Sequence, residues 1–341
     1  MTIAILKPIV VDFLREGNNR LLTTGEAARV LHKRHPELFT TFEMARKNVR
    51  VVRGASGNIN SGTRNRNGKP VADLIRTKEE VAKWKNQFPK PLDEGFQWHN
   101  LPTTAKRWLI LADIHIPYYA KDDLIVALEH GREKGCDGVL YLGDTCDCYQ
   151  MSDFCRDPRM RSFAGEAETT KEVFDLVNDF IKPKAVIWKL GNHEERYEKY
   201  LYRKAPELLG LPGNTFEAIF GTKDRGIEII PATHPIRHKS LTLLHGHEYK
   251  GGFIAPVNPA RGMFLRANES VVSAHQHKTS EHTEQTVLGK IITCWSVGAL
   301  CNLHPKYSPL NKWNSGFAYL ETNEGKYWKL HNKRIIGGNV V

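Results

Sequence analysis

The chain has 341 residues, of which 40% are hydrophobic and 26% charged, and its formal net charge is +11. This length accommodates one large domain and a small one, and no apolar run reaches the roughly 18 residues that a membrane helix needs. The N-terminus lacks the pattern of a signal peptide and the six Cys form no disulfide framework. We therefore expect a cytoplasmic protein with free thiols and no membrane partner.

The positive charge is concentrated in the first third of the chain. Residues 1–107 contain 20 Lys and Arg against 10 Asp and Glu, whereas residues 108–341 contain 29 against 28. Such an asymmetry favours a polyanionic partner, and we expect a nucleic acid. A basic, solvated surface that serves solubility is the alternative.

The N-terminal third is predicted to be mainly helical. A short helix is expected around Ile9–Arg15, and a second helix, capped by Thr23 or Thr24, should end at His35 because Pro36 follows. A third helix is expected to begin near Thr40 or Thr41. Its basic residues are Arg46, Lys47, Arg50 and Arg53. This pair of short helices resembles a helix-turn-helix that binds nucleic acid, and the alternative is a helical pair that packs on the rest of the protein.

A Gly-, Asn- and Ser-rich stretch follows at residues 55–68. It contains Arg64 and Arg66 and is typical either of a flexible basic loop that contacts phosphates or of a plain exposed loop. Residues 71–88 predict an amphipathic helix, and a Pro-containing connector leads to a domain boundary near residue 100. We therefore expect a basic, nucleic-acid-binding helical domain over 1–100 and a second domain over 101–341.

The second domain begins with alternating strands and helices. The expected β-α-β-α-β elements are 107–113, 121–135, 138–144, 166–183 and 185–191. This alternation predicts parallel strands, with a site at their carboxyl ends. The later strands have short links that suit a second sheet, and they are expected at 241–247, 270–277, 290–298 and 316–323. The predicted fold is a two-sheet α/β sandwich with a small, mainly helical N-terminal domain.

Five of these apolar strands end in residues that bind metals. The residues are Asp113, His115, Asp144, Asn192, His193, His245, His247, His275 and His277. In each Asp-x-His or His-x-His pair, residues i and i+2 of an extended strand point the same way, so their side chains should converge. The mixture of nitrogen and oxygen ligands without thiolate suits Mn²⁺, Zn²⁺ or Fe. Without His193 and His247, seven candidate ligands remain, which exceeds what one ion binds, and Asp144 is the natural bridge between two ions.

The motifs DIH, GD, GNHE, HGH and AHQH, in this order, resemble those of the calcineurin-like metallophosphoesterase superfamily over residues 106–320. The resemblance implies one metal site formed by Asp113, His115, Asp144 and His277. It implies a second site formed by Asp144, Asn192, His245 and His275. In the same comparison His193 corresponds to the catalytic histidine, which donates to the phosphate or protonates the leaving oxygen. Ala274 stands where the last motif usually has glycine.

Within that superfamily, the protein Ser/Thr phosphatases carry an Asp-Arg-Gly after the second motif, which GDTCDCYQ lacks, and HGG instead of HGH. These differences argue against that branch. The segments GDTCDCYQMSDFCRDP and SVGALCNLHPKYSPLNKWNSGFAYLE are similar to metallophosphoesterases encoded by tailed phages.

Several polar residues near the motifs have two interpretations each. Asp147 either orients a ligand or occupies a turn, and Arg196 either clamps a phosphate or pairs with neighbouring glutamates. His247 is the alternative to His245 as a ligand. The thiols Cys146, Cys148 and Cys155 lack the partners of a metal site and are expected to be free.

We expect a phosphodiesterase or nuclease that hydrolyses DNA or RNA with a hydroxide shared by two divalent ions, Mn²⁺ first and Zn²⁺ or Fe as alternatives. Two other hypotheses are a phosphomonoesterase acting on small molecules or proteins, and a nucleic-acid-binding protein whose catalytic domain is vestigial. The oligomeric state is left open by the sequence.

Overall fold

The structure is a computed structural model that describes residues 3–54, 78–92, 95–154, 157, 159, 162–249, 257–322, 325 and 327–341. Its contacts divide the chain into two compact units, residues 1–93 and residues 94–341. The predicted loop with Arg64 and Arg66, and the first part of the helix expected over 71–88, lie outside the described residues. Each unit is described by itself.

The first unit contains α1 (Ile3–Arg15), α2 (Thr24–Arg34), α3 (Phe42–Val52) and α4 (Lys78–Gln87), with a short 3-10 turn at Asn19–Leu21. Thr23 forms a capping box at the start of α2. The Thr23 hydroxyl accepts from the Glu26 backbone amide, and the Glu26 carboxylate accepts from the Thr23 backbone amide. At the start of α3, the Thr41 hydroxyl accepts from the Met44 backbone amide. The first three helices share a core that includes Leu6, Leu31 and Val49.

The second unit begins with a seven-stranded sheet of order β13-β12-β11-β2-β3-β4-β5. Its parallel strands are β2 (Arg107–Leu111), β3 (Gly138–Leu142), β4 (Ala185–Lys189) and β5 (Ile227–Ile230). Its antiparallel strands are β11 (Gly316–Thr322), β12 (Trp328–Ile336) and β13 (Asn339–Val340). All four parallel strands therefore end at one edge, where the expected site should lie.

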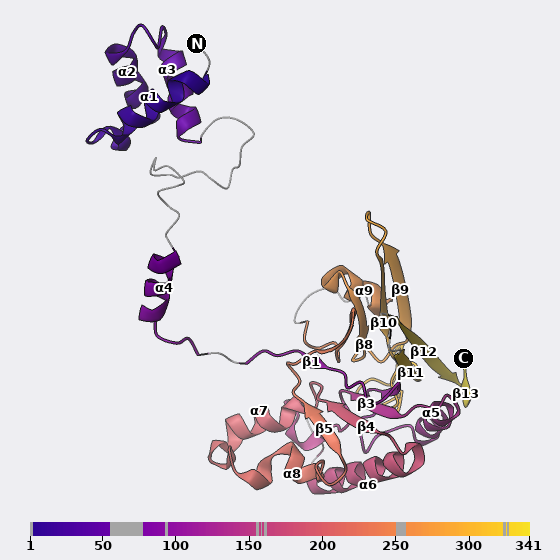
Figure 1. Cartoon of the computed structure of the whole chain (residues 1–341). Coiled ribbons are helices and arrows are strands. Elements are labelled where there is room, and N and C mark those ends of the chain that lie inside the picture. The colour runs from indigo at the N-terminus through magenta and orange to yellow at the C-terminus, as the bar shows by residue number, and fades with distance from the viewer. Residues whose placement is uncertain are drawn as a thin grey trace. The chain divides into compact units, whose positions relative to one another are not determined.

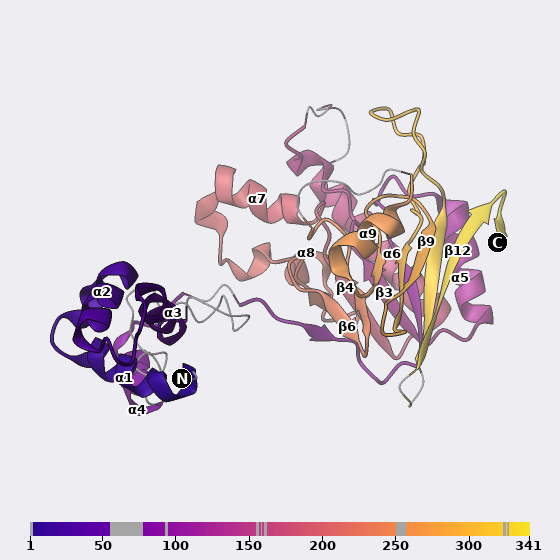
Figure 2. The same ribbon diagram turned by 90° about the horizontal axis from the view of Figure 1, so that it is seen from above.

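A six-stranded sheet of order β1-β6-β7-β8-β10-β9 packs against the first. Its strands are β1 (His99–Asn100), β6 (Ile236–His238), β7 (Leu241–Leu243), β8 (Ser270–Ser273), β9 (Ser280–Gln285) and β10 (Ile291–Ser296). Helices α5 (Lys121–Glu133), α6 (Phe163–Ile181) and α8 (Phe216–Phe220) cover the outer face of the seven-stranded sheet, and α9 (Pro259–Ala267) covers the other sheet (Figure 1; Figure 2). Helix α7 (Glu195–Lys204) follows β4. The two-sheet α/β sandwich predicted from the sequence is confirmed.

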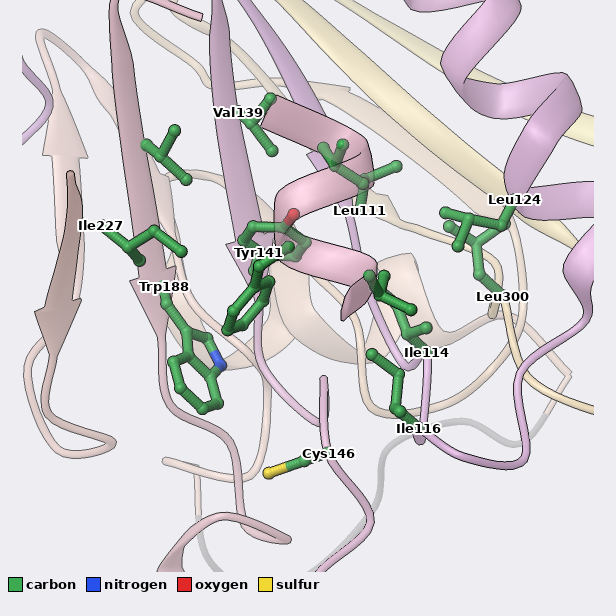
Figure 3. Packing of buried hydrophobic residues seen from close by; sticks show 14 of the residues in the cluster. Leu111, Ile114, Ile116, Leu124, Val139, Tyr141, Cys146, Trp188, Ile227 and Leu300 are labelled. Carbon is green, nitrogen blue, oxygen red and sulfur yellow. The ribbon is translucent and has the colours of Figure 1, made fainter. Parts of the chain in front are cut away.

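Alternation along the central strands builds the two cores. Trp108 and Ile110 of β2 face the six-stranded sheet, whereas Leu109 and Leu111 face the helices. On the helix side, Tyr141 of β3 and Trp188 of β4 point into the same layer (Figure 3), and Phe174 of α6 lies 4.9 Å and 5.2 Å from their ring centroids. This rigid aromatic layer holds the strand ends in fixed positions.

The segment 316–323 was expected in the second sheet, and this expectation is wrong. Strand β11 pairs antiparallel with β2, with Leu320 opposite Trp108. Ala318 enters the core between the sheets and Phe317 enters the core under the helices, so β11 is buried on both faces. A central position in the larger sheet buries the apolar side chains on both faces of β11. The long segment 297–315 lets the chain cross from β10 in one sheet to β11 in the other. In the part of the chain that the structure describes, no helix is both long and apolar enough to traverse a bilayer.

Candidate dinuclear metal centre

The predicted ligands meet where strands from both sheets end. Asp113 and His115 follow β2 and Asp144 follows β3, while His245 follows β7 and His277 follows β8. Asp144 Oδ2 lies 3.1 Å from His245 Nε2, and Asp113 Oδ1 lies 3.4 Å from His277 Nε2. His115 Nε2 lies 3.9 Å from Asp144 Oδ2. These five side chains are buried and form one cluster.

The convergence comes from left-handed turns and not from extended strands, so the expected i, i+2 geometry is wrong. The strands end at Leu111 and Ser273, before the ligands. Five ligand positions have positive φ angles between 49° and 67°, and they are Asp113, His115, Asp144, His275 and His277. Non-glycine residues adopt this conformation only when the surroundings enforce it, and such strain is typical of functional sites.

Two glycines allow the close approach of the ligand loops. A Cβ at Gly143 would lie 2.3 Å from His245 Nδ1, and a Cβ at Gly191 would lie 2.3 Å from Asp144 Oδ1. A side chain at either position would displace a ligand. The glycines of the GD and GNHE motifs are therefore needed for space, and Gly143 also has a φ of 88°.

The polar atoms of this cluster fit divalent metal ions. Asp113 Oδ1, Asn192 Oδ1 and His245 Nε2 are buried without a hydrogen-bond partner among the described residues. His115 Nε2 and His277 Nε2 face each other at 3.2 Å. Buried acceptors that point at each other are costly unless a cation lies among them.

The outer nitrogens of two ligands have protein partners, which orients the inner nitrogens. His245 Nδ1 donates to the Leu142 carbonyl oxygen at 2.8 Å, and His115 Nδ1 donates to Asp147 Oδ1 at 3.0 Å. Each Nε2 is then directed into the cluster, where it can bind a metal ion after any proton on it has been displaced. Asp144, His245 and His275 have ligand atoms close enough to bind one ion.

The charges in the cluster favour a cation. Burial opposes the charge on His245, but Asp144 and Asp113 outweigh it and raise the pKa of His245 to about 10. Burial likewise opposes the charge on His277, and Asp113 outweighs it to raise that pKa to about 10. Burial also disfavours the charge of Asp144, yet the surrounding imidazoles hold its pKa well below the usual range. The buried carboxylates thus stay ionised and require positive charge next to them, which protons on the imidazoles or metal ions can supply.

His193 lies beside the cluster, close enough to His115 and Asp144 for the three to share a metal ion. Its Nδ1 donates to Asp147 Oδ1 at 2.9 Å, and its Nε2 accepts from Arg196 Nη2 at 2.8 Å. Although Nε2 lies 3.7 Å from Asp144 Oδ2, both ring nitrogens already have protein partners. These two partners fix the imidazole of His193 beside the cluster.

The structure gives partners to two residues that the sequence left open. Asp147 accepts from both His115 and His193, so its carboxylate orients a predicted ligand and the predicted catalytic histidine together. Arg196 donates to the Asp147 carbonyl oxygen at 2.9 Å in addition to His193. Its guanidinium therefore places a positive charge next to His193.

Glu194 is a supporting residue that the sequence analysis gave no role. Its carboxylate is buried and accepts from the backbone amides of Asp144, Thr145 and Gly191 at 3.0, 2.6 and 2.7 Å. These bonds join the loop after β3 to the loop after β4. The position of Glu194 directly after Gly-Asn-His was a signal in the sequence, but nothing there indicated which amides it would bind.

Lys189 and Glu248 form a second support that sequence reasoning missed. Lys189 is fully buried, and its Nζ lies 3.0 Å from Glu248 Oε1 and 2.6 Å from the Ala232 carbonyl oxygen. Glu248 in turn accepts from the amides of His245 and Gly246 at 3.1 and 2.6 Å. A lysine inside the apolar run AVIWKLG was the available signal, because a buried cation needs a partner.

His247 and the cysteines lie beside the centre. His247 Nε2 lies 3.9 Å from Glu195 Oε1, whereas His245 is the member of HGH that approaches Asp144. Cys146 and Cys148 are buried, and burial raises the pKa of both thiols, so they stay protonated. Cys155 lies outside the described residues.

The predicted nucleic-acid residues belong to the separate first unit. Arg46, Lys47 and Arg50 are exposed on α3. Arg53 differs, because its guanidinium donates to the Leu22 carbonyl oxygen at 2.8 Å and is held inside the helical unit. Arg53 therefore stabilises the fold of this unit and is left out of the contacts proposed below.

The sequence profile of the calcineurin-like phosphoesterases matches residues 106–282, which contain every residue of the metal cluster. The chain belongs to the calcineurin-like phosphoesterase family. Membership confirms the resemblance carried by the five motifs, and this phosphoesterase has the candidate ligands of a dinuclear metal hydrolase. No curated protein matches the phosphoesterase.

Three solved structures are similar to this chain. Vps29 from Entamoeba histolytica, as a single mutant, is 15% identical, with a TM-score of 0.36 over 69% of this chain and 96% of that one. Yfce, a phosphoesterase from E. coli, is 16% identical, with a TM-score of 0.29 over 62% and 87% of the two chains. A dimetal phosphatase from Danio rerio is 11% identical, with a TM-score of 0.32 over 66% and 98%.

Proposed function

We propose that the protein is a metal-dependent phosphodiesterase that hydrolyses DNA or RNA. The observation that carries this proposal is the presence, in one chain, of the metal cluster and of a separate helical unit that exposes Arg46, Lys47 and Arg50 on one helix. A cationic helix surface of this kind binds phosphate backbones, and the cluster suits phosphoester hydrolysis.

Two sets of residues would hold the two ions. Asp113, His115, Asp144 and His277 form the first set, and Asp144, Asn192, His245 and His275 form the second. Divalent ions bound there supply an activated water and neutralise charge on the phosphate oxygens. We propose Mn²⁺, with Zn²⁺ or Fe as alternatives, because the donors are imidazole and carboxylate without thiolate.

The protein's own groups divide the remaining work. The Asp147 carboxylate holds the proton of His193 on Nδ1, and this leaves Nε2 directed toward the cluster. There Nε2 would exchange a proton with the leaving oxygen once the Arg196 guanidinium, its present partner, turns to the phosphate and stabilises the negative charge there.

A substrate panel tests the proposal. The purified protein is incubated with Mn²⁺ and plasmid DNA, single-stranded DNA or RNA, and in parallel with p-nitrophenyl phosphate and bis-p-nitrophenyl phosphate. We expect cleavage of nucleic acid and preference for the diester, and none of these activities in Asp144→Ala. Rapid turnover of the monoester without cleavage of any polynucleotide would instead support a phosphomonoesterase.

A further inference from the structure

The segment 297–315 between β10 and β11 carries two aromatic side chains beside the metal cluster. The Trp313 ring lies edge-on to the imidazole of His277, with 4.2 Å between centroids, and Tyr307 lies 6.3 Å from Trp313. Tyr307 is 76% exposed and Trp313 is half-buried. Neither ring belongs to a hydrophobic core cluster of the described residues, so core packing does not explain them.

The aromatic pair is held by a hydrogen-bonded scaffold. The Asn311 side-chain amide donates to the carbonyl oxygens of Leu303 and Ser308 at 2.6 and 2.7 Å, and its oxygen accepts from the Trp313 amide at 2.9 Å. These bonds close the turn that presents Tyr307. The two rings are therefore positioned before any ligand arrives, which reduces the entropy lost on binding.

The end of this loop is tied to the ligand segment itself. The Asn314 amide donates to the His277 carbonyl oxygen at 2.9 Å, and Asn314 Oδ1 accepts from the Thr279 amide at 2.9 Å. The position of the rings relative to a predicted metal ligand is thus set by main-chain contacts, and a group bound to the rings would lie next to the reacting phosphate.

The charges around the pair suit a nucleotide. Burial of the phenol end and the charges of Asp147 and Cys301 raise the pKa of Tyr307 to about 12, so the ring is neutral at physiological pH. Lys306 and Lys312 are exposed in the same loop and can approach phosphates on either side.

We propose that Tyr307 and Trp313 form a stacking subsite for the nucleobase next to the scissile phosphate, with Lys306 and Lys312 serving the flanking backbone. Aromatic rings bind bases of any sequence, because every base has a π face. The inference rests on the phosphodiesterase proposal and extends it, because it requires a substrate with a base and distinguishes nucleic acid from base-free diesters.

Two diesters with the same leaving group test this subsite. Thymidine 5′-(p-nitrophenyl phosphate) carries a base, whereas methyl p-nitrophenyl phosphate does not. We expect the wild-type protein to have the higher kcat/KM for the thymidine ester. Tyr307→Ala should lower this value about tenfold, the size expected for loss of one base–aromatic stack, while the methyl ester changes less than about twofold. Tyr307→Phe should retain the preference.

The matched control is Leu310→Ala, which removes a 96% exposed apolar side chain from the same loop and should change neither substrate. A second readout is calorimetric titration with thymidine 5′-monophosphate and with inorganic phosphate. Tyr307→Ala should weaken only the nucleotide. Equal losses on both diesters, or no loss on either, would overturn the subsite and leave the phosphodiesterase intact. Failure of the wild-type protein to hydrolyse either diester would overturn the proposed function and the subsite with it.

Discussion

His193 has a protein partner on each ring nitrogen, Asp147 on Nδ1 and Arg196 on Nε2. Its removal should therefore cost catalysis without emptying the metal sites. We expect His193→Ala to lower kcat by about 10²–10⁴-fold, the usual contribution of a general acid or base, with the metal content of the purified protein unchanged. Elemental analysis beside steady-state kinetics measures both quantities, and parallel loss of metal would make His193 a ligand.

Asp144 provides the opposite case at the same scale. Its carboxylate lies 3.1 Å from His245 and 3.9 Å from His115, so it belongs to both proposed ion sites. We expect Asp144→Ala to reduce the bound Mn²⁺ at both positions and to abolish turnover. A variant that keeps one full equivalent of metal would show that Asp144 does not bridge.

The raised pKa values of His245 and His277, about 10 in both cases, determine how metal binding depends on pH. In the unfolded chain these imidazoles titrate near about 6.5. The stability they contribute to the metal-free protein is complete below that pH and is lost as the pH rises toward about 10. Divalent ions must also displace these protons.

We therefore expect Mn²⁺ affinity to increase between about pH 7 and pH 9, with protons released on binding. The Tm of the metal-free protein should fall over the same range. Calorimetry in two buffers of different ionisation enthalpy measures the released protons. An affinity that is independent of pH would mean that the imidazoles are neutral before the metal binds.

At the scale of elements, the loops after strands are held by buried carboxylates. Lys189 at the end of β4 and Glu248 after β7 join the two sheets at the site. Removing one partner leaves a buried charge unpaired, so Lys189→Met should lower the free energy of unfolding by about 3–5 kcal/mol. Urea denaturation measures this loss, and the double variant Lys189→Met/Glu248→Gln should recover part of it. Additive losses in the double variant would show that the pair is not coupled.

How much of this architecture the sequence predicts depends on the kind of signal. Apolar runs that end in Asp or His predicted β2, β3, β4, β7 and β8 and the ligands after them. Strand β9, Ser280–Gln285, lacks such a signal because its polar side chains are mostly exposed and only its backbone pairs with β10. The sheet that contains β11 could not be predicted either. The run of apolar residues in β11 indicates a buried strand, but it does not show that β2 is the strand beside it.

The site shows the same division between chemistry and geometry. Residue types and motif order indicated which side chains could form the cluster, because the amino-acid type determines whether a side chain can bind a metal. The left-handed turns at Asp113 and His275 and the shared partner Asp147 depend on tertiary contacts between separate loops. Local pattern therefore selected side chains that lie together in the structure, but it did not predict the left-handed turns through which they converge.

At the scale of the whole molecule, each compact unit has its own core, and most of the excess positive charge belongs to the first unit. Residues 1–93 contain 18 Lys and Arg against 9 Asp and Glu. Binding to nucleic acid and hydrolysis should therefore be separable by substitution on the surface of the first unit, without loss of the metal cluster.

Replacing Arg46, Lys47 and Arg50 together by alanine tests this separation. Each phosphate contact contributes about 0.9 to the slope of log affinity against log salt, so the variant should lower the slope on duplex DNA by about 2–3. Fluorescence anisotropy at several salt concentrations measures it. Alanine at three exposed lysines of the second unit, Lys134, Lys223 and Lys329, is the matched control and should leave the slope unchanged. Because the cluster is untouched, hydrolysis of bis-p-nitrophenyl phosphate should stay at the wild-type rate, and an unchanged slope in the α3 variant would remove this helix from the interface.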